Sequence, residues 1–280
     1  MENQGHHVTL APTTGPRTAG LIARQQIERG ADLIVAAGGD GTLNEVAEGM
    51  VHTPVPLAIL PAGTANVLAT EMKLGGRLLK VAERLEQCRP HRISVGHVTC
   101  QNGAVSRHFL LMAGAGLDAQ IVYRVNLPLK ARIGKLAYWL AGWTLFGRRL
   151  AEFDVDTAGE HRACSFALLS KVRNYGGDFE IARSVSLFDD RFEVVLFEGR
   201  STLRYIKYFA GLVFNRVESI RGVRVARTDC ARLSISSDPR VHVQVDGEYA
   251  GQLPAEIRIV PDAITLMVPP EYGNGTKGGA

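Results

Sequence analysis

The feature that most constrains this 280-residue chain is a glycine-rich loop between two apolar segments. The short apolar run Asp32–Ala37 (DLIVAA) leads directly into Gly38-Gly39-Asp40-Gly41-Thr42. The residues that follow, Leu43–Met50, place apolar side chains at positions 43, 46, 47 and 50, which is the spacing of one helix face. The pattern therefore predicts a buried strand, a tight loop and a helix, the repeating unit of a parallel α/β sheet.

The same alternation extends over the first 92 residues. We expect strands at His7–Thr13 and Pro56–Leu60, and helices at Pro16–Arg29 and Gly76–Gln87. Continuous apolar strands separated by helices are typical of a parallel sheet covered on both faces. The fold class predicted for residues 1–92 is thus an α/β domain built on a parallel sheet.

After about residue 92 the pattern changes to short strands joined by turn-rich segments, which predicts a mostly antiparallel β-sandwich over residues 93–280. Asp246-Gly247 between two apolar alternations is a strong hairpin signal. Two helices, at about 133–147 and 202–214, interrupt the strands, and the tail from about 271 to 280 is expected to be disordered. The expected strands are Ile93–Thr99, Phe109–Ala113, Ser165–Ser170, Phe192–Phe197, Leu233–Ser236, Val241–Val245, Ile257–Val260 and Ile264–Val268.

Composition and net charge exclude several classes of protein. Apolar residues make up 46% of the chain and charged residues 21%, an ordinary globular balance that excludes a disordered chain. The net charge of +4 is too small to indicate a nucleic-acid partner, and none is expected. The four cysteines show no CxxC spacing, so a reducing cytoplasm fits best. No signal-peptide pattern is seen, and the longest apolar stretch, Leu136–Phe146, is far shorter than the roughly 20 residues of a membrane-spanning helix.

The glycine-rich loop has the chemistry of a phosphate site. Its three glycines let backbone N–H groups approach an anion, and the helix that follows adds its positive end. The loop is not a dinucleotide fingerprint, which would place a third glycine at Asn44, and it lacks the Gly-Lys-Ser/Thr of a Walker A loop. Asp40 is unusual here, because phosphate repels a carboxylate unless that carboxylate holds a metal ion or takes a hydroxyl proton. The alternative is that Asp40 only caps a helix.

A second loop of similar design follows the strand at Pro56–Leu60. Pro61-Ala62-Gly63-Thr64-Ala65-Asn66 opens the next helix, and Thr13 ends the first expected strand on the same edge. Taken alone, Thr64 is better explained as a helix N-cap, but two such loops at the carboxyl edge of one sheet favour a shared ligand crevice. In the first loop, Thr42 and Glu45 have the S/T-x-x-E spacing of a capping box.

Together these motifs resemble the lipid-kinase family of diacylglycerol and sphingosine kinases, in its bacterial branch. In chain order the similar segments are GGDGT with LNEVA, PAGTANVLA, FLLMAGAGLD, LKARIGKLAY, SLFDDRFEV and VDGE, over about residues 8–269. GGDGT alone is shared with NAD kinases and phosphofructokinases, whereas the full set is more specific. The resemblance implies an α/β nucleotide domain of the NAD kinase and diacylglycerol kinase type, a β-rich lipid-binding domain, and ATP in the cleft between them. It implies transfer of the γ-phosphate of Mg-ATP to a lipid hydroxyl.

The resemblance also implies roles for single residues. Glu248 would accept the hydroxyl proton, Asp40 would have a catalytic or Mg-ATP role, and Asp189 would hold an additional, structural magnesium ion. The alternatives are that Glu248 only flanks a hairpin turn, and that Asp189 belongs to an ordinary acidic turn in which Asp190 stands where the family has glycine. The residues implied to line ATP are Thr13, Gly38, Gly39, Asp40, Gly41, Thr42, Leu43, Asn44, Glu45, Gly63, Thr64 and Asn66.

The chain departs from the family pattern at its beginning. Nothing resembling the family's first strand and Asn-Pro-x-Ser/Ala-Gly loop precedes Val8, so the first strand–helix unit is missing on this pattern. Its loss would expose a sheet edge and remove a wall of the ATP site. A misassigned start site is one explanation of the missing unit, and a truncated kinase is another. Two alternatives for the function stay open. One is an NAD kinase-like enzyme, which would need a polar pocket, and the other is a non-catalytic nucleotide- or lipid-binding protein derived from a truncated kinase.

A basic segment points to a membrane surface. Residues 121–150 hold six basic and no acidic residues together with two tryptophans. Such a segment suits an anionic bilayer, so a peripheral contact with the membrane that holds the lipid substrate is expected. The alternative is a core helix with solvated arginines at its ends. A second basic stretch, Arg200–Arg240, would extend the same surface. The sequence leaves the oligomeric state open, a dimer included.

Overall fold

A computed structural model describes residues 2, 5–124, 149–175, 179–214, 216–236 and 241–274. It divides into two compact units, Met1–Ser94 with Pro261–Ala280, and Val95–Val260. The expected division after residue 92 assigned residues 261–280 to the second domain, whereas the structure groups them with the first unit. The expected helix at 133–147 and the last residues of the tail, 275–280, lie outside the described residues.

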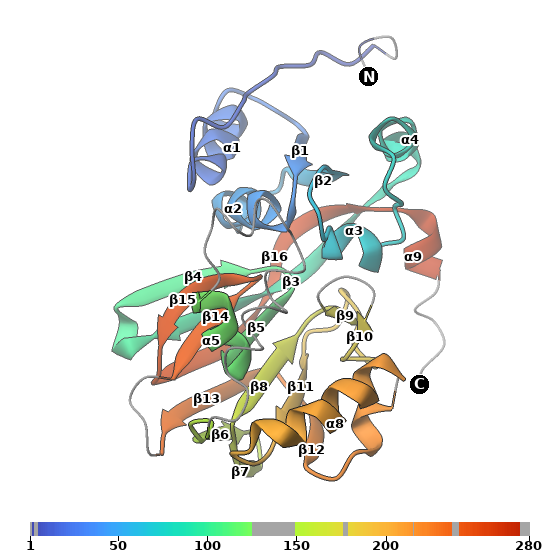
Figure 1. Ribbon diagram of the computed structural model, residues 1–280. Helices are drawn as coiled ribbons and strands as arrows, with labels where there is room; N and C mark the ends of the chain where they lie inside the picture. Colours follow the sequence, from blue (N-terminus) through green and yellow to red (C-terminus); the bar gives the residue numbers. More distant parts are fainter. Residues whose placement is uncertain are drawn as a thin grey trace. The chain divides into compact units, whose positions relative to one another are not determined.

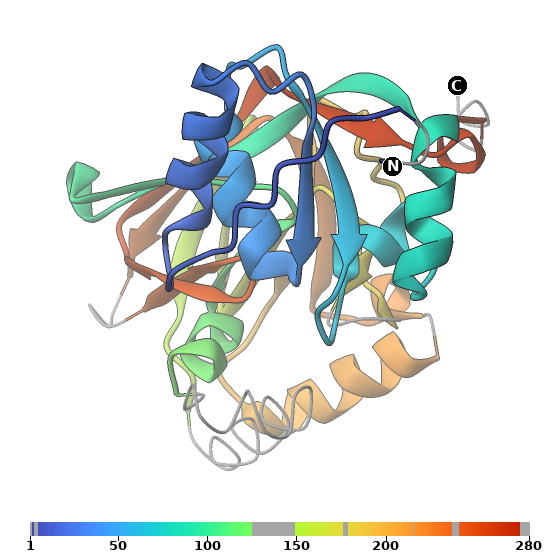
Figure 2. The ribbon, with the colours of Figure 1, turned by 90° about the horizontal axis from the view of Figure 1, so that it is seen from above.

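The first unit is built on parallel strands, as predicted. β1 (Ile34–Gly38) pairs in parallel with β2 (Pro56–Pro61), and β2 pairs in parallel with the last part of β16 (Ala255–Val268). Figure 2 shows α1 (Ala19–Glu28) lying against α2 (Asp40–Met50). The other helical segments of this unit are α3 (Val67–Glu71), α4 (Leu78–Arg84), η2 (Leu85–Gln87) and α9 (Pro270–Asn274).

Two side-chain contacts tie the C-terminal helix α9 to the first unit. The hydroxyl of Tyr272 donates to a carboxylate oxygen of buried Glu71 at 2.9 Å, and Arg84 pairs with Glu271 at 2.5 Å. Tyr272 itself is buried. These contacts explain why α9 belongs to the first unit although it follows β16 at the end of the described residues. The disorder expected from about residue 271 is therefore wrong for residues 271–274, which form part of α9.

The strand expected at His7–Thr13 is wrong. These residues form no strand, all of them except Val8 are exposed, and Leu10 is 89% exposed. A strand needs a hydrogen-bonding neighbour. Among the described residues β1 ends the strand order β1-β2-β16, and no strand is paired on its other side.

The second unit is an antiparallel β-sandwich, also as predicted. One sheet has the order β12-β11-β8-β5-β14-β15, and Figure 1 shows its central strands side by side. Its strands are β5 (Met112–Gly116), β8 (Phe166–Ser170), β11 (Phe192–Phe197), β12 (Val223–Thr228), β14 (His242–Val245) and β15 (Glu248–Gln252). The opposing strands are β3 (Arg89–Cys100), β4 (Val105–Phe109), β6 (Phe153–Thr157), β7 (Glu160–Cys164), β13 (Cys230–Ile235) and the first part of β16.

A hydrophobic cluster joins these two layers. It takes Phe153 and Ile257 from one layer and Leu169 and Phe192 from the other, all of them fully buried. The rings of Phe109 and Phe192 stack with their centroids 5.8 Å apart. The shorter elements of this unit are η3 (Gln101–Gly103), α5 (Leu117–Arg124), β9 (Asn174–Tyr175), β10 (Phe179–Glu180), α8 (Thr202–Val213) and η4 (Val217–Ser219).

Two of the expected strand assignments are rearranged in the structure. The two strands expected at Ile257–Val260 and Ile264–Val268 form one 14-residue strand, β16. Pro261, which has no N–H to donate, is exposed and lies where β16 changes its partner from β13 to β2. Conversely, the strand expected at Phe109–Ala113 is divided between β4 and β5, because the N–H groups at the break bind a side chain instead of a strand.

Candidate active site

The two glycine loops of the first unit lie in direct contact. The backbone N–H of Ala62 donates to the carbonyl oxygen of Gly38 at 2.9 Å. A Cβ atom built on Gly63 would lie 2.4 Å from the Cα of Gly39, and one built on Gly39 would lie 3.2 Å from the Cα of Gly63. The backbone of Gly39 therefore leaves no room for a side chain at position 63. The loops meet at the carboxyl ends of β1 and β2, as the sequence predicted.

Asp40 connects one loop to the helix that follows the other. Its two carboxylate oxygens accept hydrogen bonds from the backbone N–H groups of Val67 at 3.1 Å and Leu68 at 3.3 Å. These N–H groups open α3 and have no partner within their own helix. Asp40 is thus a cap, but it caps the helix after the second loop rather than its own.

Asn66 closes the second loop on itself. Its backbone is left-handed, with φ of 46°, a conformation that asparagine tolerates better than most residues. Its Oδ1 accepts from the N–H of Gly63 and its Nδ2 donates to the carbonyl oxygen of Gly63, both at 2.8 Å. The side chain of Asn66 therefore holds the loop closed, and Thr64 is exposed.

The capping box predicted from Thr42 and Glu45 is wrong. The N-cap of α2 is Gly39, with no side-chain cap. Glu45 instead accepts hydrogen bonds from the backbone N–H groups of Arg17 at 2.9 Å and Ala19 at 3.1 Å, at the start of α1. A glutamate in a helix can reach a neighbouring helix as easily as its own first turn, and here α1 packs close enough to be capped.

Three other residues implied to line ATP have different surroundings. Leu43 is 1% exposed and belongs to the core, so its side chain does not face a ligand. Asn44 is 4% exposed, and its Oδ1 has no hydrogen-bond partner among the described residues. Thr13 is exposed and lies in the segment that forms no strand, so the structure does not place it at a strand end. Of the three, only Asn44 offers an unused polar atom.

In the second unit, the predicted hairpin at Asp246-Gly247 is confirmed. Val245 pairs with Glu248, and the two turn residues have φ of 49° and 78°, as a two-residue type I′ turn requires. The carboxylate of Asp246 accepts three backbone N–H groups, from Leu110, Leu111 and Met112, at 2.9, 3.0 and 2.9 Å. One side chain therefore anchors the hairpin to the break between β4 and β5.

Glu248 is the first residue of β15, directly after this turn. Its Oε2 accepts a hydrogen bond from Nη2 of Arg107 on β4 at 3.0 Å. The side chains of Arg107 and Glu248 are 23% and 39% exposed, so the carboxylate is held on one side and open to solvent in part. No sequence signal pointed to Arg107, because it lies 141 residues from Glu248 along the chain.

The residues around Asp189 do not fit the magnesium ion that the resemblance implied. Its Oδ2 accepts hydrogen bonds from Arg227 at 2.5 Å and from the backbone N–H of Ser186 at 3.0 Å. Its carbonyl oxygen accepts a hydrogen bond from the ammonium group of Lys171. Two cationic side chains thus already bind this residue. Among the described residues, no group of three or more His, Cys, Asp or Glu side chains is arranged to hold a metal ion.

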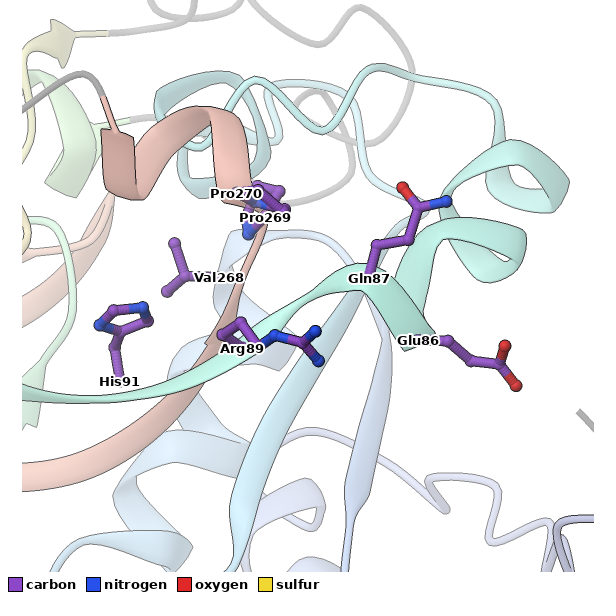
Figure 3. A pocket seen from close by; sticks show the side chains of 7 residues that line it. All are labelled: Glu86, Gln87, Arg89, His91, Val268, Pro269 and Pro270. Carbon is purple, nitrogen blue, oxygen red and sulfur yellow. The ribbon is translucent and has the colours of Figure 1, made fainter.

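A separate cavity of about 610 Å³ lies in the first unit, between the start of β3 and the end of β16 (Figure 3). No residue implied to bind ATP lines it, so it is distinct from the glycine loops. Its lining residues are Glu86, Gln87, Arg89, His91, Val268, Pro269 and Pro270.

Paired glycine loops on a parallel α/β unit, followed by an antiparallel sandwich, define a protein of the NAD kinase and diacylglycerol kinase fold class. Two family descriptions match the chain: "Diacylglycerol kinase catalytic domain" over residues 1–98, and "YegS C-terminal NAD kinase beta sandwich-like domain" over residues 112–268. The chain belongs to this diacylglycerol kinase family of lipid kinases, with its YegS-type C-terminal domain.

Relatives and solved structures agree with this assignment. The chain is 28% identical to a diacylglycerol kinase of Bacillus subtilis (strain 168), covering 97% of this chain and 89% of the relative. It is 26% identical to a diacylglycerol kinase of Staphylococcus haemolyticus, covering 98% and 82%. A crystal structure of a diacylglycerol kinase from Bacillus anthracis (strain Sterne) has the same fold, with a TM-score of 0.72 at 19% identity over 92% of this chain and 85% of that one.

Proposed function

We propose that this protein transfers the γ-phosphate of Mg-ATP to the hydroxyl group of a lipid such as diacylglycerol or a sphingoid base. The observation that carries the proposal is the contact between the two glycine loops at Gly39 and Gly63, fixed by Asp40. Family membership supplies the reaction class, and the names of the relatives favour diacylglycerol as the acceptor.

The residues of the first unit fit the phosphates of ATP. Side chains are absent where the two loops meet, so backbone N–H groups can approach an anion closely. The 11-residue helix α2 begins in the first loop and directs its positive end toward it. Magnesium, bound together with ATP, would neutralise phosphate charge.

We assign the two candidate carboxylates to different tasks. Both oxygens of Asp40 accept backbone N–H groups, and a proton taken up there would break one of these bonds. Glu248 is held by Arg107 and is 39% exposed, so a lipid hydroxyl can reach it. In the proposed reaction the hydroxyl oxygen attacks the γ-phosphorus and its proton passes to Glu248. The bond between the γ-phosphorus and the β–γ bridging oxygen breaks, and ADP leaves.

The proposal is tested by offering γ-labelled Mg-ATP to a panel of lipid alcohols in mixed micelles and, in a separate reaction, to NAD. A labelled lipid would support it and name the acceptor. Label transferred only to NAD would favour the alternative of an NAD kinase-like enzyme. If calorimetry shows ATP binding but no acceptor is labelled, the chain is a non-catalytic nucleotide-binding protein.

Asp40 variants separate the capping role from a proton-accepting role. Because asparagine caps helices about as well as aspartate, we expect Asp40→Asn to keep a measurable part of the transfer rate and to bind ATP. Asp40→Ala removes both acceptors, and we expect it to lower ATP affinity and rate together. The measurement is the rate of labelled-lipid formation beside ATP binding by calorimetry. If Asp40→Asn binds ATP like the parent but is as inactive as Asp40→Ala, Asp40 takes part in the chemistry.

We also propose that the protein contacts the membrane peripherally. Most of the basic segment 121–150 lies outside the described residues, and in the described part no helix is long and apolar enough to cross a bilayer.

Helix α8 and the residues that follow it offer a contact surface of their own. Ile206 and Phe214 are 52% and 73% exposed. A cavity of about 590 Å³ is lined by Phe214 together with the exposed cations Lys207 and Arg216. Exposed apolar side chains beside cations suit an anionic bilayer. We name these four residues the α8 surface.

Charge reversal on the α8 surface is expected to weaken vesicle binding. Each well-placed cation contributes about 1 kcal/mol at an anionic surface, so removing two corresponds to roughly 30-fold weaker binding of Lys207→Glu/Arg216→Glu. The measurement is co-sedimentation with phosphatidylglycerol vesicles, with phosphatidylcholine vesicles as the uncharged reference. Lys80→Glu, at an exposed position of α4, is the control for a charge reversal outside the α8 surface. Unchanged sedimentation of the double variant would exclude the α8 surface as the contact.

A further inference from the structure

Lys171 is a lysine with no solvent exposure, which is rare for this residue type. It follows β8 directly, and its backbone N–H donates to the carbonyl oxygen of Leu111 at 2.8 Å. Its ammonium group donates to the carbonyl oxygen of Asp189, in the loop that leads into β11. A buried cation costs free energy unless it is paired and hydrogen-bonded, so its surroundings indicate what it does.

The surroundings of Lys171 are balanced in charge. The carboxylates of Asp189 and Asp190 act on the ammonium group and favour its charged form, while Arg227 opposes it. Arg227 in turn pairs with Asp189 at 2.5 Å. Burial lowers the pKa of Lys171 to about 8. Two cations thus face two carboxylates in this cluster.

The loop itself is ordered around the same groups. The backbone N–H of Asp189 donates to the carbonyl oxygen of Ser186 at 3.0 Å, and the N–H of Ser186 donates back to Oδ2 of Asp189 at the same distance. Lys171 holds this loop from the end of β8, and Arg227 holds it from β12. Three parts of the sheet therefore converge on one residue, Asp189.

We propose that the Lys171 ammonium group is a built-in cation that organises the loop at residues 186–190 and takes the place of the divalent metal ion implied there by the family resemblance. Magnesium needs near-octahedral oxygen ligands, yet Oδ2 and the carbonyl oxygen of Asp189 already accept hydrogen bonds from cationic donors. A divalent ion would add two positive charges to a cluster that is already neutral. The second unit then folds without a metal, and magnesium is required only with the nucleotide.

The test uses the nucleotide-free protein and needs no activity assay. We expect its Tm to be the same in EDTA and in millimolar MgCl₂, and we expect Mn²⁺ titrated in the absence of nucleotide to show no tight stoichiometric site by electron paramagnetic resonance. A Tm that falls in EDTA and recovers with Mg²⁺, or one tight Mn²⁺ site that Asp189→Asn abolishes, would overturn the proposal. Both results come from the parent fold or from a conservative variant, so they do not depend on a mutant that fails to fold.

A second test removes the positive charge of Lys171. Lys171→Met keeps an unbranched apolar chain of similar length but leaves Asp189 and Asp190 short of one cation. We expect its Tm to fall by about 5 °C or more, since the carbonyl oxygen of Asp189 loses its charged donor and the two carboxylates lose a neighbouring cation, and Mg²⁺ to restore part of the loss. Lys80→Met, at an exposed position, should leave the Tm unchanged. A Lys171→Met protein as stable as the parent would show that the ammonium group does not organise the loop.

Discussion

Glu248→Gln is expected to lower the rate of phosphoryl transfer to the lipid about 100- to 10,000-fold, the usual contribution of a general base. Glutamine keeps the size of the side chain, and its amide oxygen still accepts the hydrogen bond of Arg107, but it does not take up a proton. The Tm should therefore stay close to that of the parent. The measurement is kcat with labelled ATP at saturating lipid.

Glu256→Gln is the matched control for this substitution. Glu256 is a partly exposed glutamate of β16 that pairs with Arg232 at 3.1 Å, so it repeats the Glu–Arg geometry without any assigned chemistry. We expect its kcat to equal that of the parent. If Glu248→Gln also kept the parent kcat, Glu248 would be a structural ion pair, and the proton acceptor would have to be sought elsewhere.

Asp246→Ala is expected to destabilise the protein strongly. It leaves three backbone N–H groups, those of Leu110, Leu111 and Met112, without their acceptor. A hydrogen bond to a charged group contributes about 1.5–3 kcal/mol, and three that share one carboxylate should together contribute about 3–5 kcal/mol, within the range of the most damaging substitutions. The measurement is the free energy of unfolding in urea, followed by circular dichroism.

Two companion variants separate the causes of this loss. Asp246 has a positive φ, and alanine in that conformation costs about 1–2 kcal/mol by itself. Asp262→Ala measures this backbone cost alone, because Asp262 is exposed and has φ of 46°. Asp246→Asn keeps one acceptor oxygen and tolerates the turn, so it should fall between alanine and the parent. An Asp246→Ala protein no less stable than Asp262→Ala would show that the three hydrogen bonds contribute little.

Several strands, a helix and a hairpin were predictable because the spacing and type of neighbouring residues determine them. Apolar periodicity located β1, α2 and β2, and the Asp246-Gly247 pair located the hairpin, since few residues adopt its positive φ values. The strand at His7–Thr13 failed for the opposite reason. Its apolar residues fit a strand, but a strand requires a paired neighbour, which periodicity does not report.

The roles of the charged residues were decided by distant partners. Asp40 was expected to have a catalytic or Mg-ATP role, with helix capping as the alternative. Its carboxylate caps α3, 27 residues further along the chain, and its catalytic or Mg-ATP role stays a prediction. Glu45 was expected to complete a capping box in its own helix, and it caps α1. In each case the sequence identified a carboxylate that caps a helix in the structure. The packing of another element then determined which donor that carboxylate meets.

The sequence by itself determined the two fold classes, the paired glycine loops, the hairpin that presents Glu248, and the family. These follow from residue spacing and from backbone conformations that few residue types adopt. Only the tertiary structure decided that Arg107 holds Glu248, that Asp246 anchors residues 110–112, and that Lys171 and Arg227 bind Asp189. The physical reason is that a charged group acts on whatever lies within a few ångströms of it, and those neighbours are brought together by folding, not by their order in the chain.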